Sequence, residues 1–235
     1  MDTMTKTRLK TTAIASWSGG KDSCLAYYKS LKAGYRVSCL LNFISSGSKR
    51  GCFHGLEGKL LQLQAELIGV PLVQKEVSPD MQKYEEEFKS AVNEFLPQGV
   101  TSMVFGDIYL LDHQSWVERV CKEIGIQAVE PLWEIPTEDL IKEFLDLGFK
   151  AVIVSAKADI MGKEYIGREI NLPLVEELKK KGICPCGENG EYHTLVIDGP
   201  IFKRKLKIVK ASPLLKEGFW KHWFLDIKEY TSSEK

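Results

Sequence analysis

Short apolar runs alternate with segments of helical periodicity as far as about residue 157, and this alternation is the strongest constraint on the fold. The apolar runs lie at residues 11–17, 36–44, 71–77, 102–109, 127–133 and 150–157. The helical segments lie near residues 21–33, 56–68, 80–95, 113–124 and 137–147. Several of the runs are rich in Val, Ile and Leu without strict alternation, as in strands that are buried on both faces. The pattern predicts an α/β fold with an open, mostly parallel sheet of five to six strands and helices on both faces.

Glycines and turns mark where these elements end. Gly34, Gly69, Gly125 and Gly148 stand at the predicted helix ends, where a left-handed residue is common. The tail differs, because a helix predicted over 171–182 is followed by shorter strands with turns at residues 189–190 and 199–200. We therefore expect a larger domain over residues 1–134 and a smaller C-terminal α+β subdomain over 135–235.

The hexapeptide Ser-Gly-Gly-Lys-Asp-Ser at residues 18–23, here called the elbow, stands between the first apolar run and the first helix. Unpaired N–H groups at a helix start attract anions, and glycines let the backbone approach a phosphate. An ordinary P-loop is excluded, because it needs glycine at position 15 and Ser or Thr at 22, where this chain has Ala15 and Asp22. The elbow predicts a phosphate cradle; the alternative is an ordinary strand–helix turn. A cradle lysine should pack little, so Lys21 is expected to matter for chemistry rather than for folding.

The composition limits the other classes of function. Lys plus Arg and Asp plus Glu both total 32, so the formal net charge is zero, which argues against an extended nucleic-acid surface. No apolar run reaches the length of a membrane span, and the first ten residues lack the apolar core of a signal peptide. The six scattered cysteines are expected to be reduced thiols of a cytoplasmic protein.

The elbow resembles the signature of the PP-loop ATP pyrophosphatases, which have a HUP-like fold and cut ATP between its α and β phosphates. The blocks at 106–121, 130–133 and 186–200 are similar to those of the diphthine–ammonia ligases (diphthamide synthases). The resemblance covers about residues 11–202 in the right order. Where family members often have Tyr-His-Thr or Phe-His-Thr after the second strand, this chain keeps His54 without the threonine.

The resemblance implies a reaction with several partners. ATP and Mg²⁺ would activate a carboxylate as an acyl-adenylate, ammonium would supply the nitrogen, and diphthine on translation elongation factor 2 would be the acceptor. A homodimer is possible. The alternatives are a PP-loop enzyme of another substrate, whether a modified tRNA or a small molecule, and a non-catalytic nucleotide sensor.

The nucleotide site is expected at the carboxyl ends of the first, second and fourth strands. The resemblance implies that the domain over 1–134 binds the nucleotide and that the subdomain over 135–235 binds the other substrate. The expected residues of the nucleotide site are Ser16, Trp17, Ser18, Gly19, Gly20, Lys21, Asp22, Ser23, Phe43, His54, Gly106 and Asp107. Adenine would be contacted largely by the backbone, and the alternative for Trp17 is a core residue. In the strand order 3-2-1-4-5 of PP-loop proteins, Asp107 would face the phosphates. Mg²⁺ favours one or two carboxylates together with phosphate oxygens, which makes Asp22 and Asp107 the metal candidates. The alternatives are favourable electrostatics at the helix start for Asp22 and a hydrogen-bonded turn carboxylate for Asp107.

The expected catalytic residues are Lys21, Asp107, Glu188, Glu191 and His193. Glu188 and Glu191 would bind ammonium and take its proton, and the alternative is an exposed hairpin with a turn at 189–190.

The remaining candidates are weaker. Cys184 and Cys186 form a single C-x-C pair, which is a weak zinc signal, with sulfur transfer as a minor alternative. Asp112 is a predicted N-cap and His113 a first-turn residue of the following helix. Lys203, Lys205 and Lys207 are expected on one strand face, either solvated or forming a docking patch.

Overall fold

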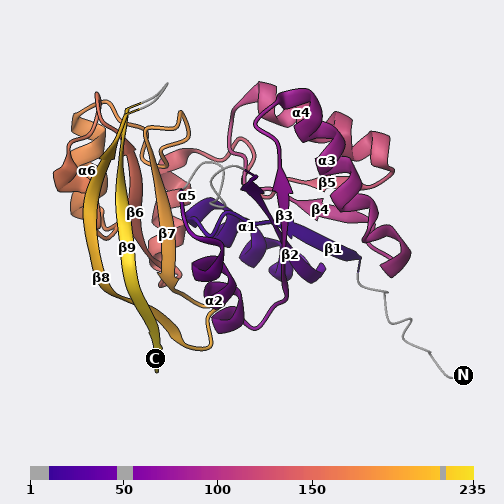
Figure 1. Ribbon diagram of the computed structural model, residues 1–235, viewed down its shortest axis with the longest axis horizontal. Coiled ribbons are helices and arrows are strands. Elements are labelled where there is room, and N and C mark those ends of the chain that lie inside the picture. Colours follow the sequence, from indigo (N-terminus) through magenta and orange to yellow (C-terminus); the bar gives the residue numbers. More distant parts are fainter. Residues whose placement is uncertain (1–10, 47–54, 218–220) are drawn as a thin grey trace, which may run out of the picture.

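The computed structural model describes residues 11–46, 55–217 and 221–235. Two sheets stand side by side with helices between and around them (Figure 1). The first half contains β1 (Thr12–Ser16), α1 (Lys21–Lys32), β2 (Arg36–Ser45), α2 (Gly58–Ile68), β3 (Leu72–Val77), α3 (Met81–Asn93), the 3₁₀ turn η1 (Leu96–Gln98), β4 (Ser102–Val104), α4 (Leu111–Ile124) and β5 (Gln127–Val129). The second half contains α5 (Thr137–Asp146), β6 (Lys150–Lys157), the 3₁₀ turn η2 (Lys163–Tyr165), α6 (Leu172–Lys180), β7 (Tyr192–Asp198), β8 (Lys205–Lys216) and β9 (His222–Ser233).

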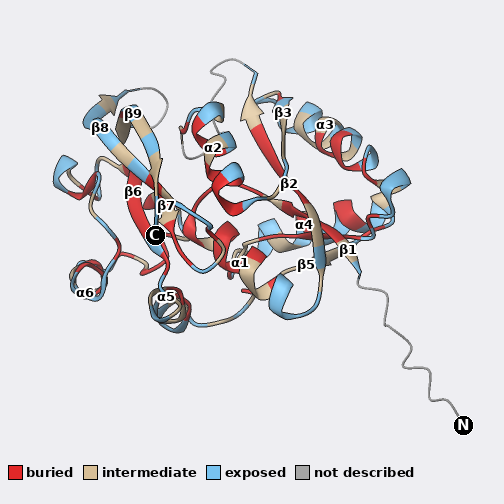
Figure 2. Ribbon diagram, turned by 90° about the horizontal axis from the view of Figure 1, so that it is seen from below, coloured by how far each residue is buried: buried red, intermediate tan, exposed pale blue. Residues whose placement is uncertain are grey.

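The first sheet is parallel and has the order β3-β2-β1-β4-β5. It confirms the predicted open parallel sheet and its strand order. Along β1 the side chains alternate between two hydrophobic clusters: Ala13 and Ala15 pack on the side of α1 and α2, whereas Ile14 packs on the side of α3 and α4. Buried residues therefore follow the strands and the helix faces turned towards them (Figure 2).

The second sheet is antiparallel and has the order β7-β6-β9-β8. This sheet confirms the predicted smaller α+β part. The apolar run at 150–157 belongs to it, so the parallel sheet has five strands and not six. The run is β6, an inner strand between β7 and β9, and its residues 151–156 are all buried. A strand covered on both faces shows the same continuous apolar pattern in either kind of sheet, so the pattern alone did not assign it. The division at residues 134 and 135 stays a prediction.

Several local predictions can be compared with the structure. The four glycines expected at helix ends all have positive φ angles, as predicted. Asp112 is not the N-cap of α4, because the helix begins at Leu111 and the carbonyl of Leu110 accepts from the N–H groups of His113 and Gln114. In the described part of the chain, no helix has the length and apolarity needed to cross a membrane.

Lys203 does not share a strand face with Lys205 and Lys207. It precedes β8, and its N–H donates to the carbonyl oxygen of Leu67 near the end of α2 (2.8 Å).

Candidate active site at the elbow

The elbow is a tight turn held by its own serines. Ser18 Oγ lies 3.2 Å from Ser23 Oγ and accepts from the N–H of Gly20 (3.3 Å), while Ser23 Oγ donates to the Gly20 carbonyl (3.0 Å). Gly19 has a φ of 78°, and a Cβ there would lie 2.4 Å from a methyl group of Leu61. The turn therefore requires glycine at position 19 on two counts, backbone conformation and space.

The second sheet completes the elbow. The N–H of Lys21 donates to Thr194 Oγ1 (3.0 Å), and the N–H of Val196 donates to the Gly19 carbonyl (2.9 Å). Gln64, which is fully buried on α2, donates through Nε2 to the carbonyls of Gly19 (3.0 Å) and Val196 (2.8 Å). Thr194 and Gln64 were not among the predicted site residues. In the sequence, Thr194 lies 173 residues from Lys21 and Gln64 lies 45 residues from Gly19, so only the fold brings them together.

Lys21 is a buried connection between the two halves. Its side chain is 5% exposed, and Nζ donates to Asp22 Oδ2 (2.8 Å) and to the carbonyl oxygen of Cys186. Burial alone would lower the pKa of Lys21, but the Asp22 carboxylate leads the interactions that outweigh burial, so its pKa is raised and the ammonium stays charged. The expectation that Lys21 packs little is wrong, because the second subdomain covers it.

Two of the predicted nucleotide-binding side chains lie in the hydrophobic core. Trp17 is 2% exposed and donates through Nε1 to Gln64 Oε1 (3.0 Å). Phe43 packs against Phe88 of α3, with 5.1 Å between ring centroids. Asn42 donates to the carbonyl of Trp17 (2.7 Å) and so ties the ends of β1 and β2 together. Contact with a ligand here would fall to the backbone. Ser16 is the last residue of β1, and His54 lies outside the described residues.

The turn after β4 lies against the start of α1. A Cβ on Gly106 would lie 3.0 Å from the carbonyl carbon of Asp22, so glycine permits this close approach. The structure thus brings Asp107 to the elbow as predicted, with a side chain that is 21% exposed and Oδ1 3.2 Å from His113 Nδ1. This hydrogen bond to Asp107 raises the pKa of His113.

Asp22 and Asp107 are close enough to interact electrostatically, and the side chain of Asp22 is 31% exposed. Among the described residues, no group of three or more His, Cys, Asp or Glu side chains is arranged to hold a metal ion by itself. A site of two carboxylates completed by phosphate oxygens still fits Mg²⁺, which usually binds that way. The five cysteines that the structure describes are free thiols, so Cys184 and Cys186 form neither a disulfide nor a zinc cluster there.

Glu188 joins the turn after β4 to the second subdomain. Its Oε1 accepts from the N–H of Ile108 (2.9 Å). Burial, reinforced by the Asp22 carboxylate, raises the pKa of Glu188 to about 7, although the hydrogen bond from Ile108 opposes the rise. Such a carboxyl group is divided between its two protonation states at neutral pH, which suits proton transfer.

Glu191 is more deeply buried than Glu188, with 7% exposure. Its Oε1 accepts from the N–H of Cys184 (3.3 Å) and from Asn189 Nδ2 (3.0 Å). Its Oε2 is buried and has no hydrogen-bond partner within the described residues. Asn189 in turn accepts from the hydroxyl group of Tyr109 (3.1 Å). The alternative of a simple exposed hairpin does not describe this segment, which is a hydrogen-bonded turn around Glu191 with one buried acceptor atom.

Two further titratable groups belong to this region. Burial lowers the pKa of His193 to about 4, so its imidazole is neutral at neutral pH. Glu130 follows β5, and burial together with Asp107 raises its pKa to about 7. Its Oε1 is buried without a hydrogen-bond partner in the described part of the chain. Glu130 was not predicted as a site residue, although it opens the block at 130–133.

Comparisons with known proteins cover both halves of the chain. A family model described as the diphthamide synthase N-terminal domain matches residues 10–128, and one described as the diphthamide synthase C-terminal domain matches residues 136–232. Proteins named diphthine–ammonia ligase from Bos taurus and Homo sapiens are each 29% identical over 222 residues, covering 84% of this chain and 82% of theirs. The protein of that name from Schizosaccharomyces pombe is 26% identical, covering 80% of this chain and 34% of its own. A solved structure titled as a predicted subunit of tRNA methyltransferase from Methanocaldococcus jannaschii matches with a TM-score of 0.44 and 17% identity, covering 81% of this chain and 98% of that one.

Proposed function

The chain belongs to the diphthamide synthase family, and from this premise we propose that it is an AMP-forming ligase that converts a carboxylate into an amide with ATP and ammonium. The names of its relatives support diphthine as the acceptor, and the resemblance to the diphthine–ammonia ligases implies that this diphthine stands on elongation factor 2. The observation that carries the proposal is the contact of Lys21 with both Asp22 and the carbonyl of Cys186. It joins the phosphate elbow to the block that contains Glu188 and Glu191.

ATP would lie with its β and γ phosphates on the elbow. The start of α1 offers backbone N–H groups. The hydroxyl groups of Ser18 and Ser23, which hydrogen-bond within the turn, would rotate to donate to the phosphates. An ammonium group has three N–H donors, and two of those of Lys21 are used within the protein. The third would bind the phosphates and stabilise the charge that develops on departing pyrophosphate.

Asp22 and Asp107 would hold Mg²⁺ beside these phosphates, and the ion would neutralise phosphate charge when bound. The fit rests on two partly exposed carboxylates next to a helix start. The pairing of Asp22 with Lys21 holds one of them in place. Asp107 is held by His113, whose raised pKa favours the charged imidazolium as its partner.

The chemistry would proceed in two displacements. An oxygen of the acceptor carboxylate attacks the α phosphorus, the α–β bond breaks, and pyrophosphate leaves. Ammonium gives one proton to Glu188 and becomes ammonia, which attacks the acyl carbon of the adenylate. The carbon–oxygen bond to AMP then breaks, and the nitrogen loses a second proton, so the products are amide, AMP and pyrophosphate.

Glu188 and Glu191 would divide the work on the nitrogen. Glu191 offers a buried, unpartnered Oε2, which suits a cationic N–H donor such as ammonium. Glu188, with its pKa near 7, would take the proton. The neutral imidazole of His193 adds no charge that would repel ammonium.

The test is chromatography of the nucleotide products. The protein is mixed with ATP, ammonium and elongation factor 2 bearing diphthine, and AMP, pyrophosphate and amide should appear in equal amounts. ADP and phosphate as the main products would refute cleavage at the α–β bond. AMP and pyrophosphate with a different carboxylate acceptor, but not with diphthine, would keep the reaction class and refute the acceptor.

A further inference from the structure

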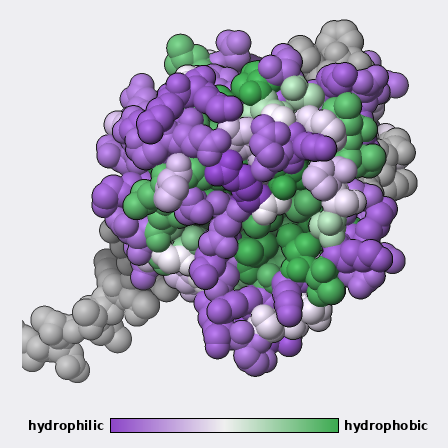
Figure 3. All heavy atoms as spheres, turned by 90° about the vertical axis from the view of Figure 1, so that its left-hand side faces the viewer, coloured by the Kyte–Doolittle hydropathy of each residue, from purple (hydrophilic) through white to green (hydrophobic). Residues whose placement is uncertain are grey.

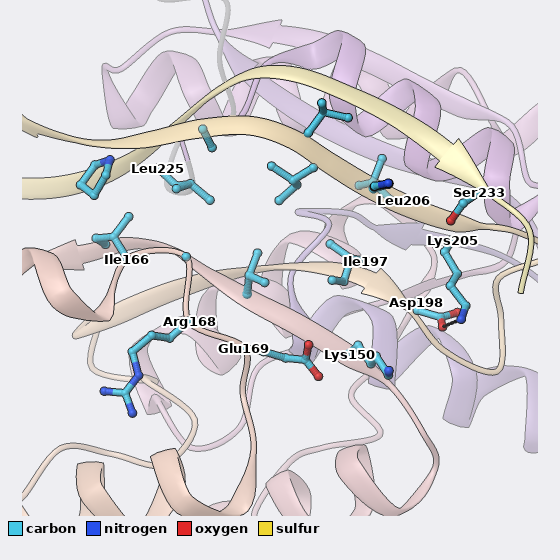
Figure 4. A pocket seen from close by; sticks show the side chains of 17 residues that line it. Lys150, Ile166, Arg168, Glu169, Ile197, Asp198, Lys205, Leu206, Leu225 and Ser233 are labelled. Atoms are coloured by element: carbon cyan, nitrogen blue, oxygen red, sulfur yellow. Dashed lines mark ion pairs between the residues drawn. The ribbon is translucent and has the colours of Figure 1, made fainter.

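A groove of about 750 Å³ lies on the second sheet, between β6 and β7 on one side and the β8–β9 ribbon on the other. Figure 4 shows apolar side chains facing one another across it, Leu225 and Leu206 from the ribbon and Ile166 and Ile197 from the opposite wall. On the face of the molecule that carries β8 and α6, Figure 3 shows hydrophobic side chains gathered within a hydrophilic border. The groove has no part in the proposed adenylation site.

The groove exists because β9 leaves β6 after a short pairing. Only Ser155–Lys157 of β6 pair with β9, opposite His222–Phe224. Further along, residues 167–170 occupy the edge of β6, with hydrogen bonds from Ile153 to the Arg168 carbonyl (3.0 Å) and from Gly167 to the Ile153 carbonyl (2.8 Å). Among the described residues, the β8–β9 ribbon continues beyond that pairing without another strand on that side, and the groove opens between its apolar face and that of β6 and β7.

The rim of the groove is basic. Four of its lining side chains are basic and two are acidic: Lys150, Arg168, Lys205 and Lys207 against Glu169 and Asp198. The chain as a whole has zero net charge, so this is a local excess. Arg168 is paired with Glu177 (2.8 Å), and Lys205 lies 3.8 Å from Asp198. Neither Lys150 nor Lys207 forms an ion pair within the described residues, and the same holds for Glu169. The unpaired charges of the rim are therefore two lysines against one glutamate.

The same charges argue against a second copy of the chain as the occupant. Strand β8 is an edge of the sheet and pairs only with β9 among the described strands, so its outer side is open to another strand. It carries Lys205, Lys207, Lys210 and Lys216. Pairing two copies of this strand would bring lysines near lysines, which is destabilising. A segment with acidic and apolar side chains would complement both the basic rim and the apolar walls of the groove.

We propose that this groove docks an acidic, apolar-containing segment of the protein acceptor, away from the residue that is amidated. The inference rests on the proposed function in requiring the acceptor to be a protein. Strand β7 runs from Tyr192, whose ring centroid lies 5.4 Å from Lys21 Nζ, to Asp198 in the groove. Its seven residues span roughly 20 Å, which a protein bridges and a small molecule does not.

The experiment measures binding of elongation factor 2 bearing diphthine by isothermal titration calorimetry without ATP, and then amide formation with ATP and ammonium. Lys150→Glu combined with Lys207→Glu should raise both Kd and the KM for the acceptor at least tenfold, with kcat within twofold. Val209→Asp, at an exposed apolar position of the groove, should weaken binding in the same way. Lys83→Glu, at an exposed position of α3, makes one such charge reversal outside the groove and should bind as the wild type does.

The outcomes separate docking from catalysis. Binding that the groove variants weaken, without amide formation in any variant, supports docking and refutes the proposed function. Normal amide formation with an unchanged KM in the groove variants refutes docking and leaves the function standing. Absence of binding to the wild type, or an effect of Lys83→Glu as large as that of the groove variants, overturns docking. A change of sedimentation coefficient in the groove variants alone would assign the groove to a second copy and also overturn it.

Discussion

Replacing Lys21 by methionine tests the elbow most directly, because methionine keeps an apolar stem of similar length and removes the charge and all three donors. Two contacts disappear, those to Asp22 Oδ2 and to the carbonyl of Cys186. The carbonyl is left without this buried donor, which costs about 1–3 kcal/mol. Asp22 is 31% exposed and can be solvated, so loss of that pair adds only about 0–1 kcal/mol.

The free energy of unfolding should therefore fall by about 2 kcal/mol, a Tm decrease of roughly 4–8 °C for a chain of this length. The variant should stay folded, since domains are typically stable by about 5–15 kcal/mol. Turnover should fall by a factor of about 10²–10³, the scale of one preorganised electrostatic contact in a transition state. Denaturant unfolding followed by tryptophan fluorescence measures the free energy of unfolding, and pyrophosphate release under saturating substrates measures turnover.

Lys29→Met is the matched control on the same helix. Lys29 also reaches the second half of the chain, with Nζ 2.8 Å from Glu143 Oε2, but both side chains are partly exposed. Its loss should cost less than about 1 kcal/mol and leave turnover unchanged. Equal stability of the Lys21 and Lys29 variants would show that the buried contacts contribute little. Wild-type turnover in Lys21→Met would refute the role of Lys21 at the phosphates.

Three further predictions follow from the same contacts. Thr194→Val should lower the free energy of unfolding by about 1 kcal/mol, because the N–H of Lys21 loses its acceptor, whereas Thr194→Ser should stay near the wild type in urea unfolding. Folding raises the pKa of Glu130 from 4.5 to about 7, so the unfolded chain loses this proton first and the wild type loses stability as the pH rises from 4.5 to about 7. Glu130→Gln should therefore gain stability relative to the wild type at pH 8 but not at pH 4, measured by unfolding at both values. The double variant Glu188→Gln with Glu191→Gln should keep the acceptor-dependent exchange of pyrophosphate into ATP but should form amide only at raised ammonium or pH. If exchange and amide formation are lost together, the two glutamates act before or during activation.

The sequence predicted those features that are local in the chain. Alternating runs and helix-ending glycines were enough for the five parallel strands, and Gly19 and Gly20 marked the elbow. The pattern left open whether β6 joins the parallel sheet as a sixth strand, because a buried inner strand looks the same in parallel and antiparallel sheets. The burial of Lys21 was missed for another reason: its contacts come from Cys186 and Thr194, and no periodicity links segments so far apart.

The part of the site that local reasoning missed also connects its two halves. Strand β7 begins just after Glu191, and three residues beyond that glutamate its Thr194 holds the first amide of α1. Three residues of extended chain span about 10 Å, so the group proposed to bind ammonium and the turn proposed to bind pyrophosphate are fixed on one short rigid element. A nucleophile and a leaving group must be held in a set geometry for a displacement to be fast. Strand β7 helps to hold the phosphate elbow, together with Gln64 of α2, and so gives both displacements that common frame. A shift of the strand would therefore disturb activation and amidation together.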